Sequence, residues 1–114
     1  MKLGLFSALD EELAGILAAM TDRLISTSAG RTYHAGRFNG VPAVAVAARM
    51  GKVAAASAAT TLIIEHKVTH LLVIGVAGAA GPRALRGDII VGRRLVQHDL
   101  DASPLAPASC TPTS

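Results

Sequence analysis

The run HLLVIGV, from His70 to Val76, constrains the fold more than any other stretch of the sequence. After the histidine it has no polar side chain, and it carries a glycine near its end. A continuous apolar run of this length is typical of a strand that is covered on both faces, as in the sheets of α/β proteins. The run therefore predicts a central strand, which the chain must cover with helices.

Shorter patterns predict the remaining elements. The apolar residues of 10–20 recur at helical spacing, and Asn39-Gly40 supplies the positive φ angles of a tight turn between two strands. Expected strands are 2–7, 31–38, 41–48, 70–76, 88–91 and 93–98, and expected helices are 10–20 and 52–66. The alternating branched residues and alanines of 41–48 suit a strand covered on both faces. The order predicts an α/β fold, a mixed β-sheet flanked by helices.

Composition limits the size and kind of core. Of the 114 residues 51% are hydrophobic but only 3% are aromatic, so the core must consist of Ala, Val, Ile and Leu. Such small side chains let helices lie close to a sheet. At this length the chain forms one domain at most, with a modest core.

Several classes of protein are disfavoured. The net charge is +3, but the Lys and Arg residues are scattered and no aromatics interleave with them, so nucleic acid is not an expected partner. Cys110 is the only cysteine, which fits a reducing compartment. No charge-free stretch reaches the roughly 20 residues of a membrane helix, and Asp10 interrupts the first apolar run too early for a signal peptide. We expect a cytoplasmic protein without a membrane contact, metal or cofactor.

Three consecutive acids, Asp10, Glu11 and Glu12, follow the first predicted strand. Acids in the first turn of a helix offset its dipole by about 0.3–1 kcal/mol each, which is reason enough for any one of them. At about 100° per residue, Glu11 points into solvent, whereas Glu12 lies at the edge of the apolar stripe. Ligands of open α/β sheets bind just past the carboxyl ends of strands. Such a site could raise the pKa of Glu12 and make it a general base.

Glycines follow the other predicted strands. The segment 75–81 has the spacing GxxGxxG, a weak match to a dinucleotide-binding loop because a strand pattern and not a helix follows it. Its glycines suit either a ligand close to the backbone or a plain tight turn. The segment 49–52 would join the same sheet edge if the strands are parallel. His34 and His70 are expected to be structural, and His98 beside acids is no metal-ligand set.

Four segments taken together, MKLGLFSALDEEL, RMGKVAAASAATTLI, VIGVAGAAGPRALRGDIIV and QHDLDAS, resemble the 5'-methylthioadenosine/S-adenosylhomocysteine nucleosidases of the purine nucleoside phosphorylase superfamily. They occur in order and with similar spacing from Met1 to about Leu105. The resemblance implies a mixed sheet flanked by helices, with the active site at the strand ends and usually a homodimer. It also implies cleavage by water of the N-glycosidic bond of adenine nucleosides.

The resemblance assigns roles to matching positions. Glu12 matches the acid that activates the water. The substrate-binding positions are matched by Ala8 and Leu9 at the ribosyl and water site, Met50 as an apolar contact, and Val76, Ala77 and Gly78 over the ribose and purine. Ala102 and Leu105 match positions that reach into the partner subunit's pocket for the alkylthio group.

Two features distinguish this sequence from members of the superfamily that it resembles. Phosphorylase members hold phosphate with Gly-Asp-Pro and an arginine in the first strand–helix loop, whereas this chain has Ser7-Ala8-Leu9-Asp10, and its clustered acids repel a phosphate dianion. Water is therefore the expected nucleophile. In addition, Val76 replaces a serine that is common at its position.

The family's second half carries a Met-Glu segment for the ribose hydroxyls, a Ser-Asp segment whose aspartate protonates the purine, and aromatics that stack the base. Nothing after Leu105 resembles them, and 102–114 is a charge-free, proline-rich tail expected to be disordered. Residues 1–101 are thus expected to be the N-terminal half of a truncated or frameshifted protein with little activity of its own. Two alternatives remain open: a non-catalytic half-domain that joins a full-length subunit through 102–105, and a nucleotide-binding module built on 75–81.

Overall fold

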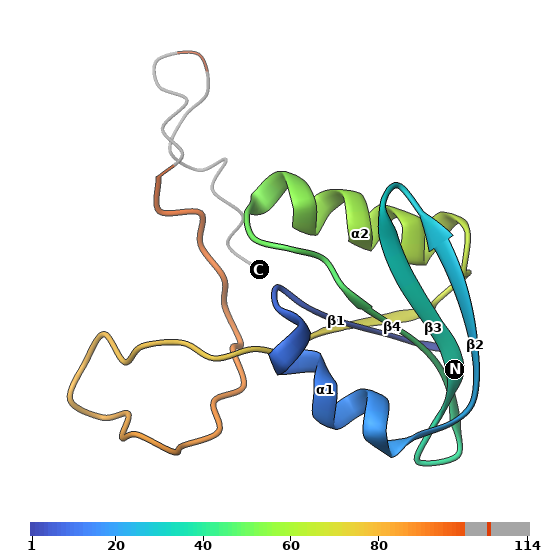
Figure 1. Ribbon diagram of the computed structural model, residues 1–114. Coiled ribbons are helices and arrows are strands. Elements are labelled where there is room, and N and C mark those ends of the chain that lie inside the picture. Colours follow the sequence, from blue (N-terminus) through green and yellow to red (C-terminus); the bar gives the residue numbers. More distant parts are fainter. Residues whose placement is uncertain (100–104, 106–114) are drawn as a thin grey trace. The chain divides into compact units, whose positions relative to one another are not determined.

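The computed structural model of the chain describes residues 1–99 and 105. The chain divides into two compact units, Met1–Ala77 and Gly78–Ser114, and every helix and strand assigned to the described residues lies in the first (Figure 1). In chain order these elements are β1 (Leu3–Ser7), α1 (Asp10–Ala19), β2 (Met20–Ser28), β3 (Arg31–Phe38), β4 (Val41–Ala47), α2 (Lys52–Ile64) and β5 (His70–Val73).

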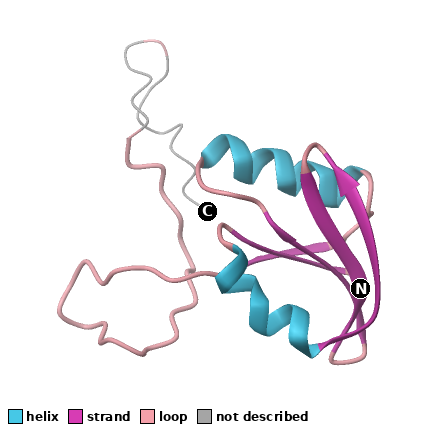
Figure 2. Cartoon of the chain, in the orientation of Figure 1, coloured by secondary structure: helices cyan, strands magenta, loops and turns pink. Residues whose placement is uncertain are grey.

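The strands form one five-stranded sheet in the order β2-β3-β4-β1-β5. β1 pairs in parallel with β4 on one side and with β5 on the other, whereas the pairs β2–β3 and β3–β4 are antiparallel. The predicted fold class, a mixed sheet flanked by helices, is confirmed (Figure 2). The parallel pairs bring the carboxyl ends of β1, β4 and β5 to the same edge of the sheet.

α1 and α2 cover opposite faces of the sheet (Figure 1). Successive residues of a strand point to opposite faces, so β1 and β4 serve both helices. The buried residues on the α1 side are Leu5, Leu13, Met20, Ala43 and Ala45. Those on the α2 side are Phe6, Tyr33, Val44, Val46, Ala48, Ala58, Leu62 and Val68. The core therefore consists largely of Ala, Val and Leu, as the composition predicted, but Phe6, Tyr33 and Met20 are also buried in it and none of these buried residues is an isoleucine.

The predicted hairpin is also confirmed. β3 and β4 have the predicted positions to within one residue, and Asn39 and Gly40 between them have φ angles of 48° and 77°. The four central residues of β4 are all buried, as expected of a strand covered on both faces. α2 ends two residues earlier than predicted, and Lys67 beyond it has a φ of 56°.

β2 was not predicted from the sequence. Seven of its nine residues are exposed, so it lacks the alternation of apolar and polar side chains that identifies a half-buried strand. Ala29 and Gly30, with φ angles of 48° and 73°, form the turn that leads it into β3. β2 is the outermost strand on its side of the sheet, which explains its exposure.

The prediction that HLLVIGV forms a central strand is wrong in two respects, its length and its position in the sheet. β5 covers only its first four residues, and it is an edge strand that pairs with β1 alone. Leu71, Leu72 and Val73 are 40%, 53% and 68% exposed. Ile74 still donates a backbone hydrogen bond of 2.9 Å to Phe6, after which the chain leaves the sheet. A central position requires a second neighbour, and no described residue supplies one.

The strands predicted at 88–91 and 93–98 are not present. Both segments lie in the second unit, whose described residues form neither helix nor strand. Ile89 is 94% exposed. An apolar pattern becomes a strand only where a neighbour pairs with its N–H and C=O groups, and the described residues of this unit offer none. The tail predicted at 102–114 lies outside the described residues except for Leu105, and the boundary at 101 stays a prediction.

No helix in the described part of the chain has the length and apolar character needed to cross a membrane.

Candidate active site

The candidate site lies at the edge where the three parallel strands end. β1 continues through Ala8 and Leu9 into α1, β4 continues through Arg49 and Met50 towards α2, and β5 continues into residues 74–77. The sequence predicted that these three junctions share one edge if the strands are parallel, and they do. Open α/β sheets bind their ligands outside such an edge.

The carboxylate of Glu12 joins two of these junctions through three hydrogen bonds. Its Oε2 atom accepts from the backbone N–H groups of Ala8 and Leu9, both at 3.1 Å. Its Oε1 atom accepts from the backbone N–H of Val76 at 3.0 Å. One side chain on α1 therefore links the end of β1 to the segment that follows β5.

The position of Glu12 in the helix explains this reach. It is the third residue of α1, from which a glutamate side chain extends back to the free N–H groups at the helix start. The next residue, Leu13, is buried and fixes the rotation of the helix about its axis. As predicted, Glu12 lies at the edge of the buried stripe, and it is half-buried.

The expectation that this site raises the pKa of Glu12 is wrong. The Val76 N–H, then the Leu9 N–H and finally that of Ala8 lower the pKa of Glu12, and partial burial opposes them. Hydrogen bonds to the charged form of a carboxyl favour that form. Glu12 is therefore a carboxylate at neutral pH, the state in which it can accept a proton.

Asp10 and Glu11 behave differently from Glu12. Both are exposed, as predicted for Glu11, and neither carboxylate has a hydrogen bond or ion pair within the described part of the chain. Their position in the first turn of α1 is favourable because it faces the positive end of the helix dipole. They act as a helix start, and they also give this edge of the sheet a negative charge.

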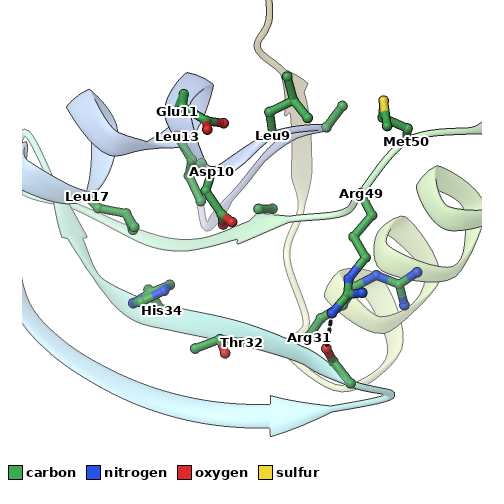
Figure 3. A pocket seen from close by; sticks show the side chains of 13 residues that line it. Leu9, Asp10, Glu11, Leu13, Leu17, Arg31, Thr32, His34, Arg49 and Met50 are labelled. Atoms are coloured by element: carbon green, nitrogen blue, oxygen red, sulfur yellow. Dashed lines mark hydrogen bonds between the residues drawn. The ribbon is translucent and has the colours of Figure 1, made fainter.

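A groove of about 560 Å³ lies beside the Glu12 junction, and three of the predicted substrate-binding residues line it: Ala8, Leu9 and Met50. Asp10 and Glu11 border it from α1, and Arg31 and Arg49 border it from the strand ends (Figure 3). Arg49 donates a 3.3 Å hydrogen bond to the Gly30 carbonyl, marked by the dashed line in Figure 3. Glu12 itself is not among the residues that line this groove.

The structure places the remaining predicted site residues at the candidate site only in part. Val76 is 87% exposed and contacts Glu12 through its backbone N–H, and Ala77 is the last residue of the first unit. Gly78 begins the second unit, so its relation to Glu12 stays a prediction. Ala102 lies outside the described residues. Leu105 is 96% exposed, which leaves its role at a partner subunit untested.

The alternative of a nucleotide-binding module built on 75–81 stays a prediction, although the structure lacks one feature of a dinucleotide loop. A dinucleotide loop must lead directly into a helix whose N-terminus holds the pyrophosphate. No helix follows residues 75–81 within the described chain.

The sequence interpretation missed the place of two groups of residues in the site, although it named His34 and the glycines of 75–81. Arg31 and His34 of β3 line the groove, a position that the predicted β3–β4 hairpin implied because it brings the start of β3 to the end of β4. Arg31 donates from Nε to the Ala48 carbonyl at 2.8 Å and so holds these strand ends together. The second group is Gly75, whose neighbourhood to Glu12 no local pattern could reveal.

Comparison with known proteins identifies relatives with this architecture. A model of the phosphorylase superfamily matches residues 2–113. The chain is 38% identical over 101 residues to a 5'-methylthioadenosine/S-adenosylhomocysteine nucleosidase of Marinomonas sp. (strain MWYL1), which covers 89% of this chain and 44% of that protein. The chain thus spans less than half the length of the curated relatives that it matches.

Solved structures agree with this result. The structure of the Streptococcus pneumoniae MTA/SAH nucleosidase in complex with 8-aminoadenine has a TM-score of 0.91 and 30% identity, over 95% of this chain and 48% of that one. The nucleosidase of Colwellia psychrerythraea in complex with adenine has a TM-score of 0.90 and 34% identity, over 94% of this chain and 44% of that one.

Proposed function

Because this chain belongs to the phosphorylase superfamily, we propose that it carries the water-activating base and part of the nucleoside site of an adenine-releasing nucleosidase. The observation that carries the proposal is the Glu12 carboxylate, which three backbone N–H groups hold at the carboxyl ends of parallel strands. The relatives named above, 30–38% identical to this chain, are 5'-methylthioadenosine/S-adenosylhomocysteine nucleosidases, which supports the same substrate class here.

In the proposed reaction the oxygen of water bonds to C1' of the ribosyl group and the bond from C1' to N9 of adenine breaks. Glu12 takes a proton from the water, and the electron pair of the broken bond goes to adenine, which must gain a proton to leave. A carboxylate with a lowered pKa is a weak base. It suits a reaction in which the sugar has already developed positive charge when the water adds.

Other residues would contact the substrate. Ala8, Leu9 and Met50 would bind it from the groove, and residues 76–78 would lie over the ribose and purine. Leu105 and Ala102 would serve a partner subunit in a homodimer. The acid that protonates adenine is expected in the half of the relatives that this chain does not match, so we expect little turnover by the chain alone.

Water is favoured over phosphate as the nucleophile. Asp10 and Glu11 have no bonded partner in the described residues, and Glu12 is ionised, so three negative charges stand at one helix start. Both guanidinium groups at the groove donate to the chain itself, Arg31 to Ala48 and Arg49 to Gly30. Like charges disfavour a dianion at such an edge.

The test is adenine release from 5'-methylthioadenosine by the purified 114-residue chain, with Glu12→Gln as the control. Release that disappears in the Gln variant supports Glu12 as the base. Release that is equal in both proteins contradicts that role. Absence of release from both is the result expected if the acid that protonates adenine lies in the half of the relatives that this chain does not match, and it leaves the superfamily assignment intact.

The second candidate is a half-domain that associates with a longer subunit of the same superfamily. The exposed edge of β5 favours it, because an apolar strand with one unpaired side is a template for another strand. Mixing the chain with the Marinomonas nucleosidase and measuring the mass of the complex by sedimentation tests this candidate. Two species that sediment separately at all concentrations would exclude it.

A further inference from the structure

We propose that Gly75 is a positioning residue for the Glu12 carboxylate: the absence of a side chain at this position leaves the space in which the carboxylate bonds to the Val76 N–H. The catalytic meaning of this role rests on the proposed function, whereas its geometric content does not.

The space around Gly75 belongs to one group of atoms. A Cβ at this position would lie 3.0 Å from Oε1, 3.4 Å from Cδ and 3.5 Å from Oε2 of Glu12. These are its three nearest neighbours, and all belong to the same carboxylate. A methyl group would therefore meet the carboxylate first.

Backbone conformation gives no competing reason for the glycine. Gly30, Gly40 and Gly51 have positive φ angles between 73° and 103°, where an L-residue is strained. Gly75 is not among the glycines with a positive φ. At Gly15, in contrast, an added Cβ would meet nothing within 4 Å, so a side chain would fit there. Space for Glu12 is thus the specific requirement at position 75.

The carboxylate can yield to a methyl group in only one direction. α1 is fixed by Leu13, which is 1% exposed, and Oε2 is held by the two N–H groups at the helix start. Oε1 is the atom nearest to the added carbon, and it accepts one hydrogen bond, from the Val76 N–H. We expect Gly75→Ala to move Oε1 away from Val76 while the bonds of Oε2 remain.

That displacement would matter for the proposed chemistry. A carboxylate accepts about four hydrogen bonds, and the described chain supplies three, which leaves a position for one water. The bond to Val76 fixes the direction in which that position points. Functional groups must be held to within about 0.5 Å of a productive geometry, so a shifted Oε1 would misplace the water.

The test is a carboxyl NMR titration of Glu12 in the 114-residue chain and in Gly75→Ala, without substrate, with the Val76 amide followed in parallel. In the wild-type chain the Val76 amide shift should titrate with Glu12. In Gly75→Ala the Glu12 pKa should rise towards its ordinary value and the Val76 amide should lose that titration. The control variant is Gly15→Ala, in the same helix as Glu12, and it should change neither the Glu12 pKa nor the Val76 amide signal.

A folded Gly75→Ala chain with an unchanged Glu12 pKa and an unchanged Val76 titration would overturn the proposal. If Gly75→Ala does not fold, the double variant Gly75→Ala/Glu12→Asp decides, because the shorter acid withdraws from the added methyl group. Recovery of the native amide spectrum supports the proposal, and failure to recover contradicts it. Since no outcome depends on adenine release, the result is independent of the proposed function.

Discussion

The Oε1 atom of Glu12 lies 3.0 Å from the backbone nitrogen of Val76, although 64 positions separate the two residues in the sequence. The same carboxylate binds the N–H groups that begin α1. A single acid therefore connects the first helix to the segment after the last strand, and its ionised form is the one that makes the connection. Stability and proposed chemistry both depend on that charge.

The first prediction concerns pH. The pKa of Glu12 is lowered from its ordinary value of 4.5 in the folded chain. Its ionised form therefore stabilises the fold above the unfolded pKa, and this contribution is lost as pH falls through the folded pKa. We expect the urea midpoint to fall between about pH 6 and about pH 3, and to fall less in Glu12→Gln. Equal slopes in both proteins would contradict the prediction.

Two histidines contribute to the pH dependence of stability at higher pH. Burial, aided by Arg23 for His34 and by Lys2 for His66, lowers the pKa of both side chains from 6.5. Because the unfolded chain binds protons more readily at these sites, they lose stabilising free energy as pH falls through about 6.5. The comparison with Glu12→Gln isolates the carboxyl, since both proteins retain the histidines.

The second prediction concerns Arg49, whose φ of 76° places a side chain in the left-handed region at the edge of the groove. Arg49→Gly should raise the free energy of unfolding by roughly 0.5–1 kcal/mol, because relief of backbone strain exceeds the entropy that glycine loses on folding. Arg49→Ala loses the same bond to Gly30 but keeps the strain, so it should show no gain. Equal stabilities of the two variants would refute the strain argument.

The third prediction concerns the hydroxyl of Tyr33. The side chain is 0% exposed, and its hydroxyl has no hydrogen-bond partner among the described residues. The ring stacks on His66 with centroids 4.9 Å apart. Tyr33→Phe keeps the ring and removes the unpaired group, so thermal unfolding should show stability unchanged or higher by up to about 1 kcal/mol. A clear loss of stability in Tyr33→Phe would contradict the prediction and would mean that the hydroxyl has a hydrogen-bond partner.

A fourth prediction tests the edge of β5. Leu72 is 53% exposed on that strand, and a lysine there would oppose the addition of a further apolar strand. Leu72→Lys should weaken association with the Marinomonas nucleosidase roughly tenfold or more. Val53→Lys serves as the control, because Val53 on α2 is itself 85% exposed, and it should leave association unchanged. Equal weakening by both lysines would place the contact elsewhere.

Local patterns were sufficient to predict most of the sheet. Two strands and a tight turn followed from Asn39-Gly40, and the helix of 10–20 followed from its apolar spacing, which also placed Glu12 correctly at the stripe edge. These features depend on neighbours a few residues apart. Local sequence patterns therefore predict these features without knowledge of the tertiary contacts of the rest of the chain.

The failures have a common cause, which is dependence on partners distant in the sequence. β2 is an exposed edge strand without alternation, and 88–91 has strand character but no neighbour in the described residues. The pKa of Glu12 was predicted in the wrong direction because its largest cause is the N–H of Val76, which only the folded sheet brings near. The proximity of Gly75 to Glu12 was missed for the same reason.

The most direct test of the account is adenine release by a chimera that joins residues 1–101 of this chain to the unmatched remainder of the Marinomonas nucleosidase. The account predicts that the folded chimera cleaves 5'-methylthioadenosine and that Glu12→Gln in it lowers the rate by about 10²–10⁴-fold. A folded chimera that releases no adenine, or one whose rate is unaffected by Glu12→Gln, would contradict the assignment of Glu12 as the base.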